Sequence, residues 1–219
     1  MPHVDATATR LPILWRVVLP AILGAIGLFI SSQAPAGSVG FYVATFFTAA
    51  VWLGTWCLWG DRKCFRGHAP KELARGAAIG IGLIALFIAG ALMVRLIPFL
   101  AAPVNDLLDN MRYGAVPITL ATLIINGIGE ELFFRDVARH ELARIWSPTR
   151  QPFASLIAQV SLYIAVTAAM GIPLLLVASV LIGGIAALEA RRAGNLISAT
   201  TLHLVWSTGM AFLLPLFIN

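Results

Sequence analysis

Two adjacent carboxylates stand in an apolar part of the chain, in the stretch NGIGEELFFRD at residues 126–136. The fifteen residues that precede Glu130 and Glu131, AVPITLATLIINGIG, carry no charge. A charge at the centre of a membrane helix costs at least ~2.5–3.5 kcal/mol on insertion scales, so an ionisable residue there is a functional candidate. Such a carboxylate can pair with a cation, or it can take a proton from water as a general base.

The two glutamates have different local partners. Glu131 and Arg135 are four residues apart, which is the favourable order for an ion pair on a helix. Glu130 projects about 100° away from Glu131 on an α-helix and has no cation nearby in the sequence. Asn126, one turn earlier, is placed to donate a hydrogen bond to it. We therefore expect Glu131 to be a structural carboxylate and Glu130 to be the candidate base.

Polar residues recur on one face of three apolar segments, and these faces are expected to converge on one interior cavity, because polar groups in lipid need partners. Glu130 lies about 13 Å along the helix from Arg139, and His203 lies about 12 Å from Asn195, so the two side chains have matched depths. The residues are Thr119, Thr122, Asn126 and Glu130; Ser155, Gln159, Tyr163 and Thr167; and Thr200, His203 and Ser207.

The composition indicates that these segments are membrane helices. Apolar residues make up 59% of the 219 residues and charged residues 11%, against about 45–50% and ~25% in soluble domains. We expect an all-α polytopic bundle of seven transmembrane helices that forms a single integral membrane domain over residues 1–219. The fifth and sixth spans are short and could instead be tilted or re-entrant. The predicted spans are Leu11–Ile30, Val39–Trp59, Ala74–Leu100, Val116–Val137, Phe153–Ala169, Pro173–Leu188 and Leu196–Ile218.

The basic residues predict the orientation of the bundle. With a cytoplasmic N-terminus, segments 1–16, 60–75, 135–152 and 189–195 hold 13 of the 15 Lys and Arg residues, and the outer loops keep only Arg95 and Arg112. This asymmetry follows the positive-inside rule, so the net charge of +5 needs no nucleic-acid partner. One alternative stays open: the first span followed by APA at Ala34–Ala36 could be a signal peptide.

The stretch EELFFR at Glu130–Arg135 matches the motif E-E-x-x-x-R, and with His203 on a later helix it resembles the CAAX protease and bacteriocin-processing family of intramembrane glutamic endopeptidases. The resemblance covers about residues 115–217. It implies that Glu130 is the base that activates water, that Glu131 and Arg135 are a supporting pair, and that His203 is an oxyanion-side group. Ser207 stands where the third motif has Asn or Asp.

One departure from the family pattern concerns the second motif, F-x-x-x-H. In this register the chain has Ile164 and Ala168, and no histidine occurs between His140 and His203. Loss of a general-base partner can cost 10²–10⁴-fold in rate; Tyr163 or Thr167 could hold the water instead. Two functions remain open: an intramembrane peptidase that acts on a membrane-associated peptide or protein, and a catalytically impaired relative that binds or regulates a membrane partner. A proton-coupled transporter is disfavoured, because no inverted repeat is found.

The remaining expectations concern ligands and location. Cys57 and Cys64 lack C-x-x-C spacing, so they are assigned no disulfide or metal role. Glu130, Glu131 and His203 lack the H-E-x-x-H spacing of a zinc site, so we expect no metal and no other cofactor. The abundance of Arg over Lys suggests a GC-rich bacterial genome, and we expect a multi-pass protein of the bacterial inner membrane. The sequence leaves the oligomeric state open.

Overall fold

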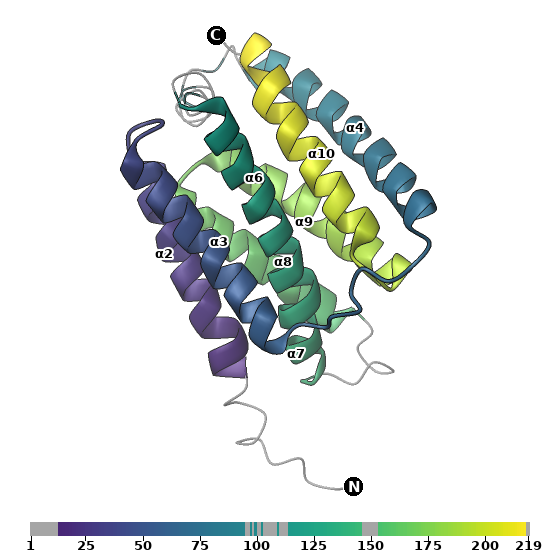
Figure 1. Cartoon of the computed structure of the whole chain (residues 1–219). Helices are drawn as coiled ribbons and strands as arrows, with labels where there is room; N and C mark the ends of the chain where they lie inside the picture. The colour runs from purple at the N-terminus through teal and green to yellow at the C-terminus, as the bar shows by residue number, and fades with distance from the viewer. Residues whose placement is uncertain are drawn as a thin grey trace, which may run out of the picture.

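The protein is an all-helical bundle in the part of the chain that the structure, a computed structural model, describes: residues 13–94, 114–145 and 153–217 and the single positions 97, 99, 102 and 109. Consecutive long helices run in alternate directions (Figure 1). The elements are η1 (Leu14–Val18), α2 (Leu19–Gln33), α3 (Val39–Trp59), α4 (Ala69–Val94), α6 (Val116–Glu130), η2 (Glu131–Ala138), α7 (Arg139–Ala143), α8 (Ala154–Thr167), η3 (Ala168–Met170), α9 (Pro173–Ala193), α10 (Ile197–Leu213) and η4 (Leu214–Leu216).

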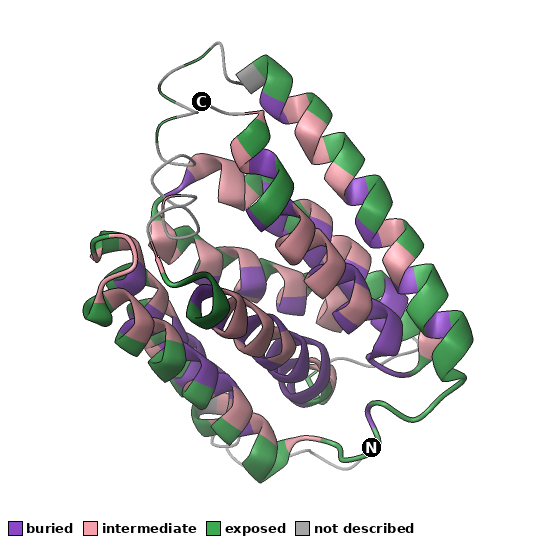
Figure 2. Ribbon diagram, turned by 45° about the horizontal axis from the view of Figure 1, so that its top comes forward, coloured by how far each residue is buried: buried purple, intermediate pink, exposed green. Residues whose placement is uncertain are grey.

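The predicted membrane bundle is confirmed. Among the described residues, six helices are long and apolar enough to cross a bilayer, and the fifth predicted span is a shorter apolar helix, Ala154–Met170. Outward-facing positions of the helices are exposed and inward-facing ones are buried (Figure 2). The ends Leu11, Leu100 and Ile218 of the predicted spans lie outside the described residues.

Local sequence explains where several helices begin and end. The Ser38 side chain accepts a hydrogen bond from the Phe41 backbone N–H at 3.1 Å and caps the start of α3. Pro173 stands at the first position of α9, where the missing N–H costs nothing. Gly194 ends α9 with a φ of 65°, a left-handed conformation that glycine adopts without strain. Pro173 and Gly194 thus set the two ends of α9.

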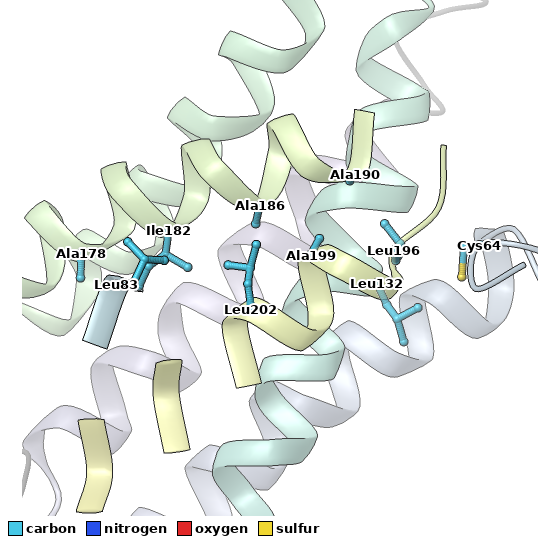
Figure 3. Packing of buried hydrophobic residues seen from close by; sticks show 10 residues of the cluster. All are labelled: Cys64, Leu83, Leu132, Ala178, Ile182, Ala186, Ala190, Leu196, Ala199 and Leu202. Atoms are coloured by element: carbon cyan, nitrogen blue, oxygen red, sulfur yellow. The ribbon is translucent and has the colours of Figure 1, made fainter. Parts of the chain in front are cut away.

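The helices form two groups on either side of α6. Helices α2 and α3 pack together on one side, and α4 lies along α10 on the other, with α8 and α9 behind (Figure 1). The buried apolar cluster between α9, α10 and the start of η2 includes Ile182, Leu132 and Leu202 (Figure 3). Cys64 joins this cluster, and burial together with Asp136 and Asp61 raises the pKa of its thiol to about 11. Cys64 is therefore expected to be a packing residue with little thiolate character.

One end of the bundle carries an ionic cluster, which we call the basic end; it contains the first turns of α4 and the last turn of α9. Arg75 donates two hydrogen bonds to the buried Glu189, at 2.7 and 2.9 Å. Arg192 binds both Glu189 and Glu72. A further pair, Arg16–Glu141, joins the start of the chain to α7 at 2.7 Å. These contacts involve residues from all four predicted cytoplasmic segments.

Four of the basic residues that predicted the orientation, Arg10, Arg95, Arg112 and Arg150, lie outside the described residues. Arg135, which was counted with the cytoplasmic charges, is instead fully buried inside the bundle. We continue to expect the basic end to be cytoplasmic, since Arg16, Arg75 and Arg192 gather there.

Helix α4 is held against α10 by glycines that allow the two backbones to approach. A Cβ at Gly76 would lie 2.5 Å from the Ser198 carbonyl oxygen, and one at Gly80 would lie 2.9 Å from that of Leu202. At Gly82, a Cβ would meet nothing within 4 Å. The small residues on one face thus act as they do in other packed membrane helices.

We expect Gly76→Ala to destabilise the protein by ~1–3 kcal/mol, because the added methyl group meets backbone that cannot move aside. Gly82→Ala is the matched control, and it should be neutral or stabilising by up to ~1 kcal/mol, since alanine is the better helix former. Thermal unfolding in detergent measures both variants. Equal stability of the two would show that α4 does not depend on this close approach.

Candidate active site

The glutamate motif lies at a change of helix type. Helix α6 ends at Glu130, and residues Glu131–Ala138 continue as a π-helix, η2, all of whose residues are buried. Two glycines just before it bring the helix close to its neighbours: a Cβ at Gly127 would lie 2.9 Å from Leu204 of α10, and one at Gly129 would lie 3.0 Å from Trp52 of α3. Short π-helical segments occur often at functional sites. The wider turn was not anticipated from the α-helical spacing of the motif.

His203 on α10 lies between the two glutamates. Its Nδ1 lies 2.7 Å from Glu131 Oε1, a hydrogen bond, and its Nε2 lies 3.9 Å from Glu130 Oε2. The expected proximity of Glu130 and His203 is therefore confirmed, whereas one interior cavity shared by the polar faces stays a prediction. The 3.9 Å separation exceeds hydrogen-bond distance, so this pair of atoms is not bonded directly.

Both glutamates lie beside the same imidazole, so Glu131 contacts His203 as well as the expected partner Arg135. A carboxylate at Nδ1 accepts the N–H of that nitrogen. Glu131 therefore orients the ring and leaves Nε2 directed towards Glu130.

The predicted pair of Glu131 and Arg135 is present. Arg135 Nε lies 3.3 Å from Glu131 Oε2, and both side chains are 0% exposed. The two atoms are not aligned as a hydrogen bond, so the contact is an ion pair without a hydrogen bond. Arg135 also donates to the Gly183 carbonyl oxygen at 3.4 Å. Its guanidinium lies 4.4 Å from the centroid of the Tyr163 ring, a cation–π contact.

The donor to Glu130 is Tyr163 and not Asn126. The Tyr163 hydroxyl donates to Glu130 Oε2 at 3.0 Å. The expected bond from Asn126 is wrong: its amide N–H groups are taken by the carbonyl oxygens of Thr45, at 3.1 Å, and Thr122, at 2.9 Å. A buried amide satisfies the nearest carbonyls, and the side of α6 that carries Asn126 lies against α3.

Of the polar residues predicted on one face of α8, Tyr163 is the one that contacts Glu130. Thr167 donates back to the Tyr163 carbonyl oxygen at 2.9 Å and so binds its own helix. Gln159 is fully buried, and its amide atoms have no hydrogen-bond partner among the described residues. The exposed Ala168, where the second-motif histidine is expected, begins η3, which packs against α2.

The other predicted residue on α10, Ser207, is partly buried, one turn beyond His203. The Ser207 side chain makes no hydrogen bond within the described part of the chain. Ser207 therefore lies next to the site, but no hydrogen bond of its side chain assigns it a role. Among the described residues, no group of three or more His, Cys, Asp and Glu side chains is placed to hold a metal ion.

Two residues of the surroundings were missed by the motif. Asp136 is 1% exposed and accepts hydrogen bonds from the Trp56 indole at 3.0 Å and the Asp61 backbone N–H at 2.7 Å, which anchors η2 to the end of α3. Gly183 makes room for the ring of Tyr163, since a Cβ there would lie 2.7 Å from its Cδ1. The adjacent glycines Gly183 and Gly184 in the sixth predicted span were the available signal.

The buried cluster therefore runs in the order Arg135, Glu131, His203, Glu130 and Tyr163. The Glu130 side chain is 16% exposed and the His203 side chain 7% exposed. The side chains of Glu131 and Arg135 are fully buried. Two carboxylates, an imidazole and a phenol in this order can orient a histidine, hold a water molecule and move a proton.

The comparisons with known proteins agree with the motif. The model of a family described as type II CAAX prenyl endopeptidase Rce1-like matches residues 112–209. This range contains both glutamates, Arg135, Ala168 and His203, and it agrees with the stretch 115–217 over which the sequence was found to resemble the family. Comparison with curated proteins and with solved structures gives no match.

Proposed function

Since residues 112–209 of this multi-pass membrane protein belong to the Rce1-like family of type II CAAX prenyl endopeptidases, which are proteases, we propose that it hydrolyses a peptide bond of a membrane-associated substrate with water activated by Glu130. The observation that carries the proposal is the placement of His203 between Glu131 at 2.7 Å and Glu130 at 3.9 Å. Amide hydrolysis needs a base for the water and a donor for the oxyanion. Glu130 can supply the base, and His203 can supply the donor.

The proposed reaction uses Glu130 first as a base and then as an acid. Glu130 takes a proton from the water molecule, whose oxygen attacks the scissile carbonyl carbon. The C–N bond then breaks, and Glu130 returns the proton to the leaving amine.

His203 is proposed to stabilise the oxyanion. Once it carries a proton on both nitrogens, Nδ1 donates to Glu131 and Nε2 can donate to the developing negative charge. Arg135, 3.3 Å from Glu131, partly balances the charge of that carboxylate and so supports the orientation of the ring.

The substrate that we propose is a C-terminal, lipid-modified peptide tail that reaches the site from the basic end. The family suggests the modification, and the depth of Glu130 suggests the route, because the site lies in that half of the bundle. The test uses purified protein in liposomes with a peptide that ends in a farnesylated Cys-Ala-Ala-Xaa sequence. The reaction is run in water labelled with a heavy oxygen isotope. Mass spectrometry of the products identifies the bond that is cleaved and shows whether the labelled oxygen is incorporated.

We expect cleavage of the farnesylated peptide, incorporation of the heavy oxygen into the new carboxylate, and unchanged activity in EDTA. The same peptide without the farnesyl group should be cut more slowly. Absence of cleavage of both peptides would overturn the proposed substrate. Failure of the heavy oxygen to enter the product would overturn the activated-water mechanism.

A further inference from the structure

We propose that Tyr163 is the positioning residue for Glu130 and supplies from α8 the support that the missing second-motif histidine would give; this inference rests on the proposed function. Tyr163 is 7% exposed, and its hydroxyl donates to Glu130 Oε2 at 3.0 Å. A hydrogen bond from a neutral donor to a carboxylate is stronger than one between two neutral groups. The tyrosine thus gives Glu130 a defined orientation beside His203.

The position of the missing histidine cannot supply this contact. Ala168 is exposed and begins a 3₁₀ turn that packs against α2. Tyr163 lies more than one turn earlier on α8, on the side that faces η2. Of the two substitutes that the sequence offered, Thr167 is occupied by the carbonyl oxygen of its own helix. The polar face of α8 therefore reaches the glutamate through Tyr163.

The ring of Tyr163 is held from three sides, so its hydroxyl is fixed in place. Phe134 packs edge-on with 5.0 Å between ring centroids. The Arg135 guanidinium lies 4.4 Å from the ring centroid. Gly183 lies against the ring at a distance that leaves no room for a methyl group. Two neighbours of the ring thus come from the E-E-x-x-x-R segment itself, and this couples the tyrosine to the motif.

The hydrogen bond assigns different tasks to the two oxygens of Glu130. Oε2 accepts the Tyr163 proton and faces His203 Nε2 at 3.9 Å. A carboxylate has further lone pairs, so Oε1 can accept a hydrogen bond from the attacking water. Tyr163 touches neither the water nor the substrate in this arrangement and acts through Glu130. A positioning role of this kind should change turnover more than substrate affinity.

The first test compares Tyr163→Phe with Tyr42→Phe in the peptide-cleavage assay. Tyr42 is a matched control, because its hydroxyl also bonds to α6, at Thr119 Oγ1 (2.8 Å), but away from the site. We expect Tyr163→Phe to lower kcat about 10- to 100-fold with KM unchanged and Tyr42→Phe to leave both unchanged. Fluorotyrosine at position 163 retains the donor and should restore most of the activity. A Tyr163→Phe enzyme with the kcat of the wild type would overturn the proposal.

A second test displaces the ring of Tyr163 while the phenol hydroxyl is kept. Gly183→Ala places a methyl group 2.7 Å from Tyr163 Cδ1, whereas a Cβ at Gly184 meets nothing within 4 Å. We expect Gly183→Ala to reproduce the loss of kcat and Gly184→Ala to behave as the wild type. Equal activity of the two glycine variants would contradict a role for the ring position.

A spectroscopic readout separates failure of this inference from failure of the proposed function. The infrared bands of the Glu130 carboxyl group are identified as those lost in Glu130→Gln. A donated hydrogen bond changes their frequency, so they should shift in Tyr163→Phe and remain in place in Tyr42→Phe. If no peptide is cleaved but the bands shift, the hydrogen bond between Tyr163 and Glu130 is supported and the proposed peptidase function is wrong. If the bands do not shift, the contact itself is wrong, whatever the activity.

Discussion

Replacing Glu130 by glutamine is expected to lower the rate of peptide cleavage by at least about 10²- to 10⁴-fold, the contribution of a positioned general base. Glutamine has the same shape and still accepts a hydrogen bond from Tyr163, but it cannot take a proton from water. The variant should therefore fold and accumulate normally. Initial rates in the liposome assay, together with thermal unfolding in detergent, measure the two effects separately.

The matched control for this variant is Glu141→Gln. Glu141 is also a buried carboxylate, but it pairs with Arg16 and Arg144 at the basic end and lies outside the site. It should retain its cleavage rate. Cleavage that survives in Glu130→Gln would remove Glu130 as the base. A cellular function that persists in this variant, with no cleavage by the wild type, would favour a membrane protein that binds its partner without catalysis.

Replacing Glu131 by glutamine is expected to cost stability as well as activity. The side chain is 0% exposed and contacts both Arg135, at 3.3 Å, and His203, at 2.7 Å. Removing one partner of a buried ion pair leaves an uncompensated charge, which typically costs ~3–5 kcal/mol. The free energy of unfolding in detergent and the amount of protein in the membrane should both fall, and the cleavage rate should fall because His203 loses its orientation.

The control is an ion pair whose basic partner is exposed and whose carboxylate keeps a second partner, Arg16. Arg144, whose side chain is 58% exposed, binds Glu141 at 3.2 Å, and Arg144→Gln should cost no more than ~1 kcal/mol. A second comparison uses the double variant Glu131→Gln with Arg135→Met, which should be less destabilised than the sum of the single changes, because no unpaired charge remains. A Glu131→Gln protein that accumulates normally and loses only turnover would show that the carboxylate is not structural.

Much of the bundle could be predicted from hydropathy, because a segment of about 20 apolar residues has few stable arrangements other than a membrane helix. Helical periodicity placed Glu131 beside Arg135, and equal depths placed Glu130 near His203. Both predictions depend only on spacing along one helix or on distance from its end. They are confirmed by the 3.3 Å and 3.9 Å separations.

The partners across helices could not be predicted in this way. Periodicity assigns a side chain to a face, but the identity of its neighbour depends on how the helices rotate and approach one another. Asn126 was expected to bind Glu130 and instead binds α3 and its own helix, whereas Tyr163 of α8 takes that place. The close contact of Gly183 with Tyr163 is likewise a property of two packed helices.

Hydropathy and spacing along the chain were enough to predict a membrane helical bundle with an E-E-x-x-x-R motif and a histidine at matching depth. The packing of the helices was needed to show that Glu131 and Glu130 face the two nitrogens of one imidazole and that a tyrosine completes the cluster. The α-helix gives way to a π-helix at Glu131, so α-helical spacing no longer describes the segment beyond it. The physical reason is that burying polar groups requires them to find partners on other helices, and those partners are set by packing.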